Sequence, residues 1–361
     1  MPEEVKITTD GIITALSKLN FTDKNFPPKA VAEYIWNGFD ARASIVEIDY
    51  EFSAGGLRRL VVRDNGHGIP PQDQLNLKFQ PIFESDKLKD DSNNRNTSQY
   101  HGKNGLGRLT FATFAQRARW ETVYQQGGEK TYSYSIEILG SRLELFSGLD
   151  EMPEESNKQS GTMVTFSDFK EYNHNKYGKN VGETELLDYL KREFCWFLEL
   201  NKYKGYKLIV NGEELDYSPL IEDEENFTLT GKRQGEKFSI RYVRWKIPPL
   251  NQEYSRYYYL DHNYTELHKE YTTLNKKGDK FYHSVFIASK YFSDFKFDST
   301  EDQENITGFG RSDETFKQLT DQLHGYLRRK RKPFLRKHAK QVIAEFEREG
   351  IIVKKMQIPF S

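Results

Sequence analysis

The stretch AEYIWNGFDA, residues 32–41, carries two patterns on one predicted helix. Its apolar residues recur at the spacing of a helix that packs one side on a core. Its polar residues, Glu33, Asn37 and Asp40, lie along another side of the same helix. The two prolines just before it suit a helix start, because the missing N–H has no helical partner there. The polar side is either an ordinary solvated face or a binding site.

The composition describes a charged, aromatic-rich chain. Its 361 residues suggest two domains, with room for an appendage. Hydrophobic residues make up 36% and aromatic residues 14%, so Tyr and Phe supply much of the core. Charged residues make up 30% and the mean hydropathy is −0.80, which indicates a charged surface rather than disorder, since disordered chains lack aromatics. The net charge of −1 means that any basic patch must be local.

The sequence lacks the features that are typical of secreted and membrane proteins. The single cysteine, Cys195, excludes a disulfide framework or a cysteine-based zinc site within the chain. The polar, acidic start MPEEVKITTDG does not have the pattern of a signal peptide. No run of 18 apolar residues exists, so the sequence predicts no membrane span and no membrane partner. The expected location is cytoplasmic.

Short elements separated by turn residues are predicted for the first 220 residues. The expected elements are a helix at 27–41, strands at 44–52 and 57–63, a hairpin of 119–125 with 131–138, a strand at 161–166, a helix at 183–200 and a strand leading to a turn at Asn211-Gly212. The polar residues 84–101 predict a long loop, and loops of this length inside a domain are usually functional. They precede GKNGLGR, residues 102–108, and LTFATFA, which has an apolar helical pattern.

A change of composition near residue 220 predicts a domain boundary. Residues 226–300 are aromatic-rich and strand-like, and residues 312–349 have a long helical pattern. That pattern contains the basic run Arg328–Lys340, with eight Lys or Arg in thirteen residues, interrupted by Pro333. The expected division is therefore 1–220, 221–311 and 312–361.

The first candidate pair for chemistry is Glu33 and Asn37. Residues four apart on a helix share a face. An amide oxygen is a suitable ligand for magnesium, which commonly bridges protein oxygens to nucleotide phosphates. A carboxylate one turn away can hold and deprotonate a water. Taken alone the pair is weak, because E-x-x-x-N occurs by chance on many helices.

The second candidate is Asp64, which ends a predicted strand and precedes Gly66 and Gly68. A carboxylate at a strand end, with glycines that allow close approach, can accept a hydrogen bond from a flat amine such as the adenine amino group. The alternative is a simple Asp-Asn-Gly turn, which taken alone is the better interpretation.

Two further stretches are ambiguous one by one. The glycines of GKNGLGR expose backbone N–H groups before an apolar helix, an arrangement that suits anions, and Lys103 and Arg108 add charge. The stretch is neither a Walker A loop nor a strand-linked G-x-G-x-x-G, and the alternative is a flexible loop. Thr162 opens a strand and can support the adenine, or it is a threonine of ordinary β-propensity.

The order of these motifs carries more information than any one of them. E-x-x-x-N-x-x-D-A, then D-x-G-x-G, then G-x-x-G-x-G after a polar loop, then G-T-x-V resembles the nucleotide-binding domain of the GHKL superfamily. That superfamily includes gyrase B, the large heat-shock chaperone, histidine kinases and MutL, with the MORC ATPases alongside. The resemblance covers roughly residues 5–215, and FESDK before the polar loop is similar to the family's serine-lysine element.

The resemblance implies an α+β fold. It predicts a Bergerat-type sandwich, which is a mixed sheet covered by helices on one face. A second α/β domain similar to a transducer domain and a C-terminal helix are expected to follow.

The resemblance also implies ATP and Mg²⁺ as cofactors and a role for each matching residue. Glu33 would be the general base, Asn37 the magnesium ligand and Asp64 the adenine anchor. The residues expected to shape or support the site are Asp40, Ala41, Gly66, Gly68 and Thr162. The expected phosphate-binding lid and serine-lysine element comprise Ser85, Lys87, Gly102, Lys103, Asn104, Gly105, Leu106 and Gly107. His67 occupies a variable position of the motif and receives no role.

Within the superfamily, the histidine kinases fit poorly. No histidine precedes His67, so the upstream phosphoacceptor of those enzymes has no counterpart, and Glu33 favours hydrolysis over phosphotransfer. In the transducer-containing families a Lys or Arg of the second domain reaches the γ-phosphate. The candidates for this contact are Lys246, Lys276, Lys277 and Arg311.

The predicted function is a slow, ATP-hydrolysing molecular switch. The preferred form is an ATP-gated homodimeric clamp of MORC or MutL type in DNA metabolism or defence. A chaperone-type ATPase that remodels client proteins and a nucleotide-regulated module that barely hydrolyses ATP are the alternatives. The basic run Arg328–Lys340 either contacts DNA or RNA or is a solvated helical face, and an effector protein or a missing C-terminal region is an expected partner.

Overall fold

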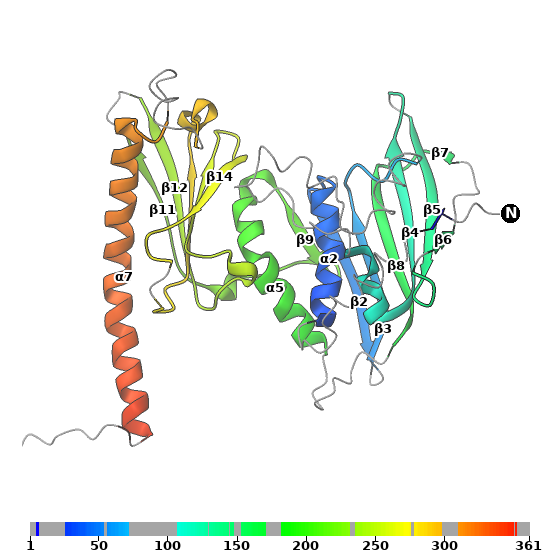
Figure 1. Cartoon of the computed structure of the whole chain (residues 1–361), viewed down its shortest axis with the longest axis horizontal. Helices are drawn as coiled ribbons and strands as arrows, with labels where there is room; N and C mark the ends of the chain where they lie inside the picture. The colour runs from blue at the N-terminus through cyan, green and yellow to red at the C-terminus, as the bar shows by residue number, and fades with distance from the viewer. Residues whose placement is uncertain are drawn as a thin grey trace, which may run out of the picture. The chain divides into compact units, whose positions relative to one another are not determined.

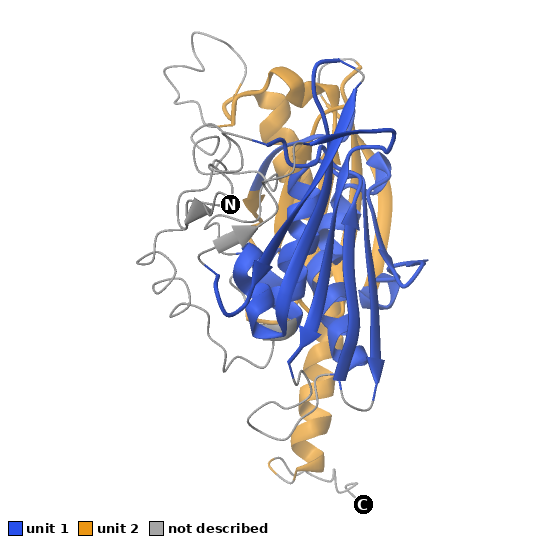
Figure 2. Cartoon of the chain, turned by 90° about the vertical axis from the view of Figure 1, so that its right-hand side faces the viewer, with its two compact units in different colours: residues 1–221, 249–253, 263–269 blue, residues 222–248, 254–262, 270–361 orange. Residues whose placement is uncertain are grey.

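The computed structural model describes residues 5–6, 26–53, 56–71, 107–128, 130–143, 145–147, 153–170, 182–231, 235–275, 278–297, 310–349 and 351. The chain forms two compact units (Figure 2). Unit 1 consists of residues 1–221, 249–253 and 263–269. Unit 2 consists of residues 222–248, 254–262 and 270–361.

Among the residues that the structure describes, unit 1 contains a mixed sheet of ten strands. The strands follow the order β1-β6-β5-β4-β8-β3-β2-β9-β10, and β7 pairs with β5. β2 and β9 run parallel, whereas β3 is antiparallel to both of its neighbours, β2 and β8. The bounds are β1 Val5–Lys6, β2 Ile45–Ser53, β3 Gly56–Asp64, β4 Ala115–Gln125, β5 Thr131–Leu139, β6 Leu145–Ser147, β7 Glu154–Ser156, β8 Gly161–Phe169, β9 Lys207–Val210 and β10 Glu213–Glu214.

Two α-helices, α2 (Phe26–Asp40) and α5 (Glu183–Leu200), lie together on one face of this sheet (Figure 1). The apolar side of α2 is fully buried, and the Trp36 ring lies 4.5 Å from that of Phe194 on α5. Gly38 allows α2 to lie directly on the strands, because a Cβ there would come within 2.8 Å of Val46 and 2.9 Å of Asp64. This arrangement confirms the predicted α+β sandwich.

A 3-10 helix, η1 (Gly107–Thr113), replaces the α-helix that the apolar pattern of LTFATFA favours. The buried Tyr34 hydroxyl of α2 donates to the Arg108 carbonyl at 2.8 Å and accepts the Phe111 N–H at 3.1 Å. An α-helix would use those backbone groups within its own ladder. The Tyr34 side chain therefore sets the local geometry of η1. Unit 1 also contains the short 3-10 helices η2 (Lys202–Lys204) and η3 (Ser218–Leu220), and unit 2 contains η5 (Lys290–Asp294).

Unit 2 contains the second sheet, with the strand order β11-β12-β15-β13-β14. Its central strand, β15, is buried at every position, pairs antiparallel with β12 and runs parallel to β13. The aromatic stretches of the sequence supply this core. The bounds are β11 Ile221–Thr230, β12 Lys237–Trp245, β13 Arg256–Leu260, β14 Glu266–Tyr271 and β15 His283–Ala288.

One long helix, α7 (Glu314–Arg348), packs against this sheet (Figure 1). It begins at a side-chain cap, because the Asp313 carboxylate accepts the Thr315 N–H at 2.9 Å. The Tyr326 ring lies 5.3 Å from the Tyr242 ring of β12. The helix continues past Pro333, whose missing N–H removes one hydrogen bond without ending the element.

The chain passes between the two units five times, at 221/222, 248/249, 253/254, 262/263 and 269/270. The segment 249–253 joins β12 to β13 and contains the short 3-10 helix η4, Leu250–Gln252. It belongs to unit 1 although both flanking strands belong to unit 2. Unit 1 is therefore completed by residues that follow its main segment in the sequence.

Candidate functional site

Gly107, the last glycine of GKNGLGR, lies against the polar side of α2. A Cβ built on it would stand 2.9 Å from Oε2 of Glu33 and 3.8 Å from Nδ2 of Asn37. The Thr110 hydroxyl holds this approach, because it lies 2.6 Å from the Gly107 carbonyl and 3.1 Å from the Ala30 carbonyl of α2. A side chain at position 107 would require the Glu33 carboxylate to move away from it. The structure thus brings three of the predicted site residues together.

The exposure of these α2 side chains suits a ligand. Glu33 is half-buried and Asn37 is exposed, whereas Asp40, at the end of the helix, is only 9% exposed. A carboxylate and an amide oxygen one turn apart are hard oxygen donors of the kind that magnesium takes in combination with phosphate oxygens. The residues present therefore fit a magnesium–nucleotide complex.

Asp64 lies at the end of β3, between Val46 of β2 and Thr162 of β8 in the register of the sheet. Its Oδ1 accepts the Gly66 N–H at 2.8 Å. Burial raises the pKa of Asp64 to about 6, against the opposing effect of backbone hydrogen bonds from Gly66 and Thr162. The protein thus keeps a half-buried carboxyl beside the helix that carries Glu33 and Asn37.

The glycines after Asp64 permit close backbone contacts. A Cβ at Gly66 would lie 2.6 Å from the Ala41 carbonyl oxygen and 2.9 Å from the Ala41 Cβ. Gly68 has a φ of +71°, and a Cβ there would lie 2.0 Å from the Val123 carbonyl oxygen. Larger residues would push the segment after Asp64 away from β4 and from the end of α2. Ala41 therefore packs beside the Asp64 loop.

A second threonine, which the sequence did not single out, completes this corner. The Thr122 hydroxyl on β4 lies 3.2 Å from the Thr162 hydroxyl and accepts the Ile69 N–H at 2.8 Å. Thr122 is 1% exposed. Its place depends on the register that pairs Thr122 with Thr162 across β4 and β8. A linear motif holds no signal for that pairing.

Other predicted site residues lie outside the described part of the chain. These are Ser85, Lys87, Gly102, Lys103, Asn104, Gly105 and Leu106, together with the γ-phosphate candidates Lys276 and Lys277. Of the other two candidates, Arg311 donates to Glu270 at 2.9 Å and to the Phe297 carbonyl at 2.9 Å. Lys246 is exposed on the segment after β12.

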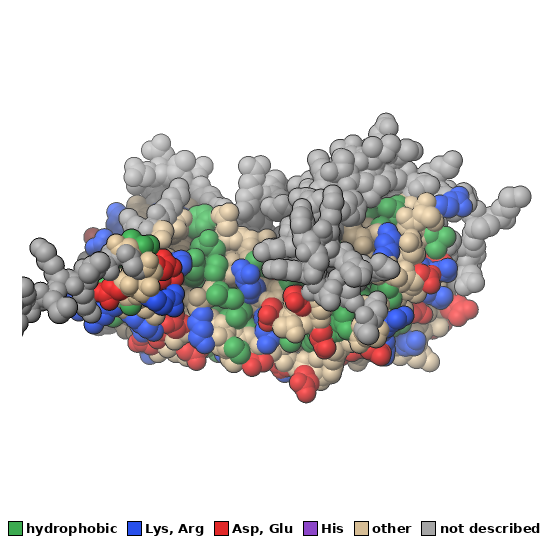
Figure 3. All heavy atoms as spheres, turned by 90° about the horizontal axis from the view of Figure 1, so that it is seen from below, with side chains coloured by type: hydrophobic (Ala, Val, Ile, Leu, Met, Phe, Trp, Pro, Cys, Tyr) green, Lys and Arg blue, Asp and Glu red, His purple; other side chains and the backbone are tan. Residues whose placement is uncertain are grey.

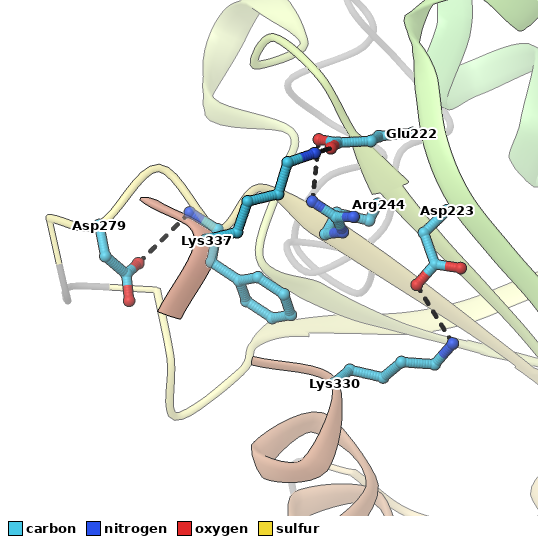
Figure 4. Close-up of polar contacts among 7 residues, drawn as sticks. Glu222, Asp223, Arg244, Asp279, Lys330 and Lys337 are labelled. Atoms are coloured by element: carbon cyan, nitrogen blue, oxygen red, sulfur yellow. Dashed lines mark hydrogen bonds and ion pairs between the residues drawn. The ribbon is translucent and has the colours of Figure 1, made fainter. Parts of the chain in front are cut away.

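The basic run on α7 is divided between two faces of the helix. Lys330 pairs with Asp223 at 3.1 Å, Lys337 lies 3.5 Å from Glu222, and Arg331 pairs with Asp279. Figure 4 shows Lys337 and Arg244 converging on the Glu222 carboxylate, with Lys330 reaching Asp223. These three cations of the run fasten α7 to the rest of unit 2.

The other face of α7 carries Arg328, Lys332, Arg336 and Lys340, each four residues from the next, with the exposed Arg329 beside them. All four are exposed, and none forms an ion pair with another described residue. Residues spaced by four share a helix face, so they form one stripe, named here the outer basic stripe. On the face of the molecule drawn in Figure 3, by contrast, acidic and basic side chains are interspersed.

Among the described residues, no helix is long and apolar enough to cross the hydrocarbon core of a bilayer. The same residues contain no group of three or more His, Cys, Asp or Glu placed to hold a metal ion. A magnesium ion bound with a nucleotide would need only one side chain of the protein, because phosphate oxygens supply other ligands. A search for clusters of three or more side chains does not test for such a site.

Comparison with known proteins agrees with the geometry. Residues 25–162 match the family described as histidine kinase-, DNA gyrase B-, and HSP90-like ATPase. The chain is 28% identical over 142 residues to the DNA mismatch repair protein MutL of Lactobacillus delbrueckii subsp. bulgaricus, which covers 39% of this chain and 19% of that protein. It is 29% identical over 116 residues to MutL of Aquifex aeolicus, covering 32% of this chain and 26% of that protein. The region around residues 25–162 is therefore a domain of the GHKL ATPase superfamily.

Proposed function

We propose that unit 1 binds ATP with Mg²⁺ and hydrolyses it slowly, as a molecular switch. The observation that carries the proposal is the position of Gly107 beside Glu33 and Asn37, where an added Cβ would lie 2.9 Å from the Glu33 carboxylate. The end of the glycine-rich stretch thus lies beside the carboxylate and the amide that we propose for hydrolysis. The family match over residues 25–162 supports the same conclusion.

Each residue of the site has a chemical role in this proposal. Asn37 would hold Mg²⁺ through its amide oxygen, and the ion would offset the negative charge of the phosphates. Glu33 holds a water and accepts its proton as the water oxygen bonds to the terminal phosphorus, while the bond from that phosphorus to the bridging oxygen breaks and ADP leaves. Asp64 accepts a hydrogen bond from the adenine amino group, and Thr162, next to Thr122, supports that edge of the base.

The backbone N–H groups of residues 102–107 are proposed to bind the phosphates, with Lys103 beside them. Ser85 and Lys87 belong to the same proposed closing segment. Contacts with the terminal phosphate would order such a segment and hydrolysis would release it. We propose that the ordered state pairs with a second copy of the chain. The similarity to two MutL proteins supports pairing of two copies, and the alignments cover 19% and 26% of the length of those proteins.

The test compares wild type with Glu33→Ala, using Glu213→Ala on exposed β10 as the matched control. ATP binding, phosphate release and mass in solution are measured with and without ATP and magnesium. We expect slow turnover by wild type and the control. The Glu33 variant should bind ATP, fail to hydrolyse it and accumulate as a dimer. If neither wild type nor variant binds ATP, the proposed site is wrong, and unchanged turnover by the variant would remove Glu33 from the mechanism.

The outer basic stripe favours nucleic acid as a partner of the switch. Four like charges at successive helical turns repel one another by roughly 0.2–0.5 kcal/mol a pair, so the arrangement gains from a polyanion. Because an α-helix rises by about 1.5 Å per residue, the stripe is long enough to contact several phosphates along one nucleic-acid strand. A chaperone-type role remains the second candidate, and suppression of client aggregation without DNA binding would favour it.

Duplex DNA binding is measured against salt for wild type and for the variant with Arg328, Lys332, Arg336 and Lys340 changed to Gln. The matched control removes four exposed cations from other elements, Arg59, Lys158, Lys204 and Lys290. We expect the stripe variant to reduce the slope of log K against log salt by about three to four, because about 0.9 counterions are released per phosphate contact. Equal losses in the two variants would show a general charge effect and exclude the stripe.

A further inference from the structure

A buried carboxylate, Glu193, lies behind the helix that carries the candidate catalytic residues. Glu193 belongs to α5 and is 3% exposed. Its Oε1 accepts the indole N–H of Trp36 on α2 at 2.8 Å. Trp36 immediately precedes Asn37 and lies one turn after Glu33. Glu193 therefore holds α2 at the level of the proposed site, from the apolar side.

The same oxygen accepts a second hydrogen bond from a distant part of the sequence. The Asn251 side-chain amide donates to Glu193 Oε1 at 2.7 Å. Asn251 lies in η4, in the segment 249–253, and has a φ of +56°. A left-handed conformation costs a non-glycine residue on the order of 1 kcal/mol, and Asn tolerates it best. The turn keeps a strained backbone that presents this amide to Glu193.

The other oxygen of Glu193, Oε2, is buried and has no hydrogen-bond partner among the described residues. A buried ionised carboxylate needs donors for its lone pairs, so each of the two donors to Oε1 matters. Burial raises the pKa of Glu193 to about 7, with Glu33 adding to the rise and Trp36, Asn251 and Lys29 opposing it. The charge of Glu193 is thus sensitive to its donors near neutral pH.

Charged groups of the neighbouring turn are already paired with each other. Lys269 donates to the carboxylate of Glu253, two residues after Asn251, at 2.9 Å in an ion pair, and both side chains are largely buried. Lys269 also lies 5.6 Å from the Trp196 ring of α5. These contacts fix the segment 249–253 on α5 within unit 1. Asn251 supplies a hydrogen bond from this segment to Glu193.

We propose that Glu193 is a positioning residue that links the turn 249–253 to the nucleotide site through Trp36. The inference rests on the proposed ATPase function and adds a means of controlling it. The turn is joined covalently to β12 and β13, so a displacement of those strands moves Asn251. Withdrawal of Asn251 removes one donor from Glu193, which then takes up a proton and weakens its hold on Trp36. As a result, Glu33 and Asn37 change orientation, because Trp36 is on the same helix. The electrostatic potential at Glu33 also changes, because Glu193 has lost its negative charge.

The first measurement does not depend on ATP. It follows the ¹⁵N-labelled indole signal of Trp36, identified with Trp36→Phe, between pH 5 and pH 9. In wild type the signal should titrate near pH 7. In Glu193→Gln it should not titrate, and in Asn251→Gly, which keeps the left-handed turn, its midpoint should move to higher pH. The control Gln252→Gly changes the adjoining left-handed residue and should leave the midpoint in place. A flat wild-type signal, or a midpoint that ignores Asn251→Gly, overturns the link.

The second measurement is the pH dependence of kcat and KM for ATP in the same variants. Glu193→Gln and Asn251→Gly should lower kcat about tenfold or more, because small misplacements of catalytic groups have effects of that size. KM should change less than about twofold, since neither side chain is proposed to touch ATP. The double variant should lose little beyond Glu193→Gln, because the two residues act through one hydrogen bond.

The two measurements separate the possible failures. A titrating Trp36 signal in a protein that neither binds nor hydrolyses ATP would refute the proposed function while leaving the Glu193–Trp36 link. A titrating signal with normal hydrolysis whose kcat and pH profile ignore Glu193→Gln and Asn251→Gly would refute the control mechanism alone.

Discussion

At the scale of single residues, the Asp64 corner is defined by close backbone contacts. Gly68 is required both by its left-handed φ of +71° and by the Val123 carbonyl beside it. The sequence predicted Asp64, Gly66 and Gly68 because a strand end followed by glycines is a local pattern. Thr122 and Glu193 were not predicted, because the first is placed by strand register and the second by helix packing. The residues next to Thr122 and Glu193 in the sequence form no pattern that predicts these contacts.

Replacement of Gly68 by alanine should destabilise the protein more than the same change at Gly127. Both glycines have a similar φ, +71° and +68°, but a Cβ at Gly127 meets nothing within 4 Å. Gly127→Ala should therefore lower the free energy of unfolding by about 1 kcal/mol, from backbone conformation alone. Gly68→Ala adds a collision with the Val123 carbonyl and should lower it by at least about 2–3 kcal/mol. Urea unfolding of both variants measures the difference, and equal losses would contradict the contact.

The raised pKa of Asp64 predicts a conflict between stability and binding. The folded-state pKa of about 6 lies above the ordinary 3.8, so the folded protein binds more protons between about pH 4 and pH 6. Stability contributed by the protonated carboxyl is therefore lost as pH rises through that window. Asp64→Asn keeps an acceptor for the Gly66 N–H and should be more stable than wild type at pH 8, by about 1–3 kcal/mol, with the gain vanishing below about pH 4.

The same Asp64→Asn variant should bind ATP more weakly, because a charged acceptor makes a hydrogen bond to the adenine amino group that is stronger by roughly 1–2 kcal/mol. Unfolding at pH 4, 6 and 8 and ATP titration at pH 8 test both effects. If the variant is less stable than wild type at pH 8, burial of the charged Asp64 carboxylate does not destabilise the folded protein. Unchanged ATP affinity would remove Asp64 from the proposed adenine contact.

At the scale of elements, the helices and strands of unit 1 were largely predictable, because their periodicity follows burial. The helix 27–41 and the helix 183–200 were placed within one residue or so of α2 and α5. The stretch LTFATFA was less predictable, since a tyrosine from another helix diverts its backbone groups into η1. The basic run was correctly found on a helix, but its division into a fastened face and an exposed face depends on the acidic residues of unit 2.

Removal of the Lys330 charge should weaken the attachment of α7. Lys330 pairs with Asp223 at 3.1 Å and Glu225 at 2.9 Å, and its ammonium lies 5.2 Å from the Tyr242 ring. Lys330→Met keeps the aliphatic stem but leaves two carboxylates close together, so the free energy of unfolding should fall by about 1–2 kcal/mol. Lys332→Met, two residues along on the exposed stripe, should change it by less than about 0.5 kcal/mol.

Chemical unfolding of the two lysine variants provides the comparison. The measurement is repeated in high salt, where screening should reduce the loss in Lys330→Met. If Lys332→Met is as destabilising as Lys330→Met, the stripe is not solvated and cannot be offered to a nucleic acid.

At the scale of the whole molecule, the family match covers residues 25–162, and the transducer-like second domain stays a prediction from the sequence. The near-zero net charge means that steering of a polyanion must come from local features such as the outer basic stripe. The composition change near residue 220 indicated a boundary, but no pattern in the sequence indicated that the chain passes five times between units. That interleaving depends on contacts between segments far apart in the chain.

The interleaving of the two units limits how this protein can be divided or inherited. A gene fragment that stops after codon 221 encodes α2 and α5 but omits the segments 249–253 and 263–269 that belong with them. In that product Glu193 loses Asn251, and the buried pair of Glu253 with Lys269 is gone. Recombination that exchanged the second half of the gene would also replace part of unit 1. The segments 249–253 and 263–269 are therefore part of the unit that carries Glu33, although they follow residue 221 in the sequence.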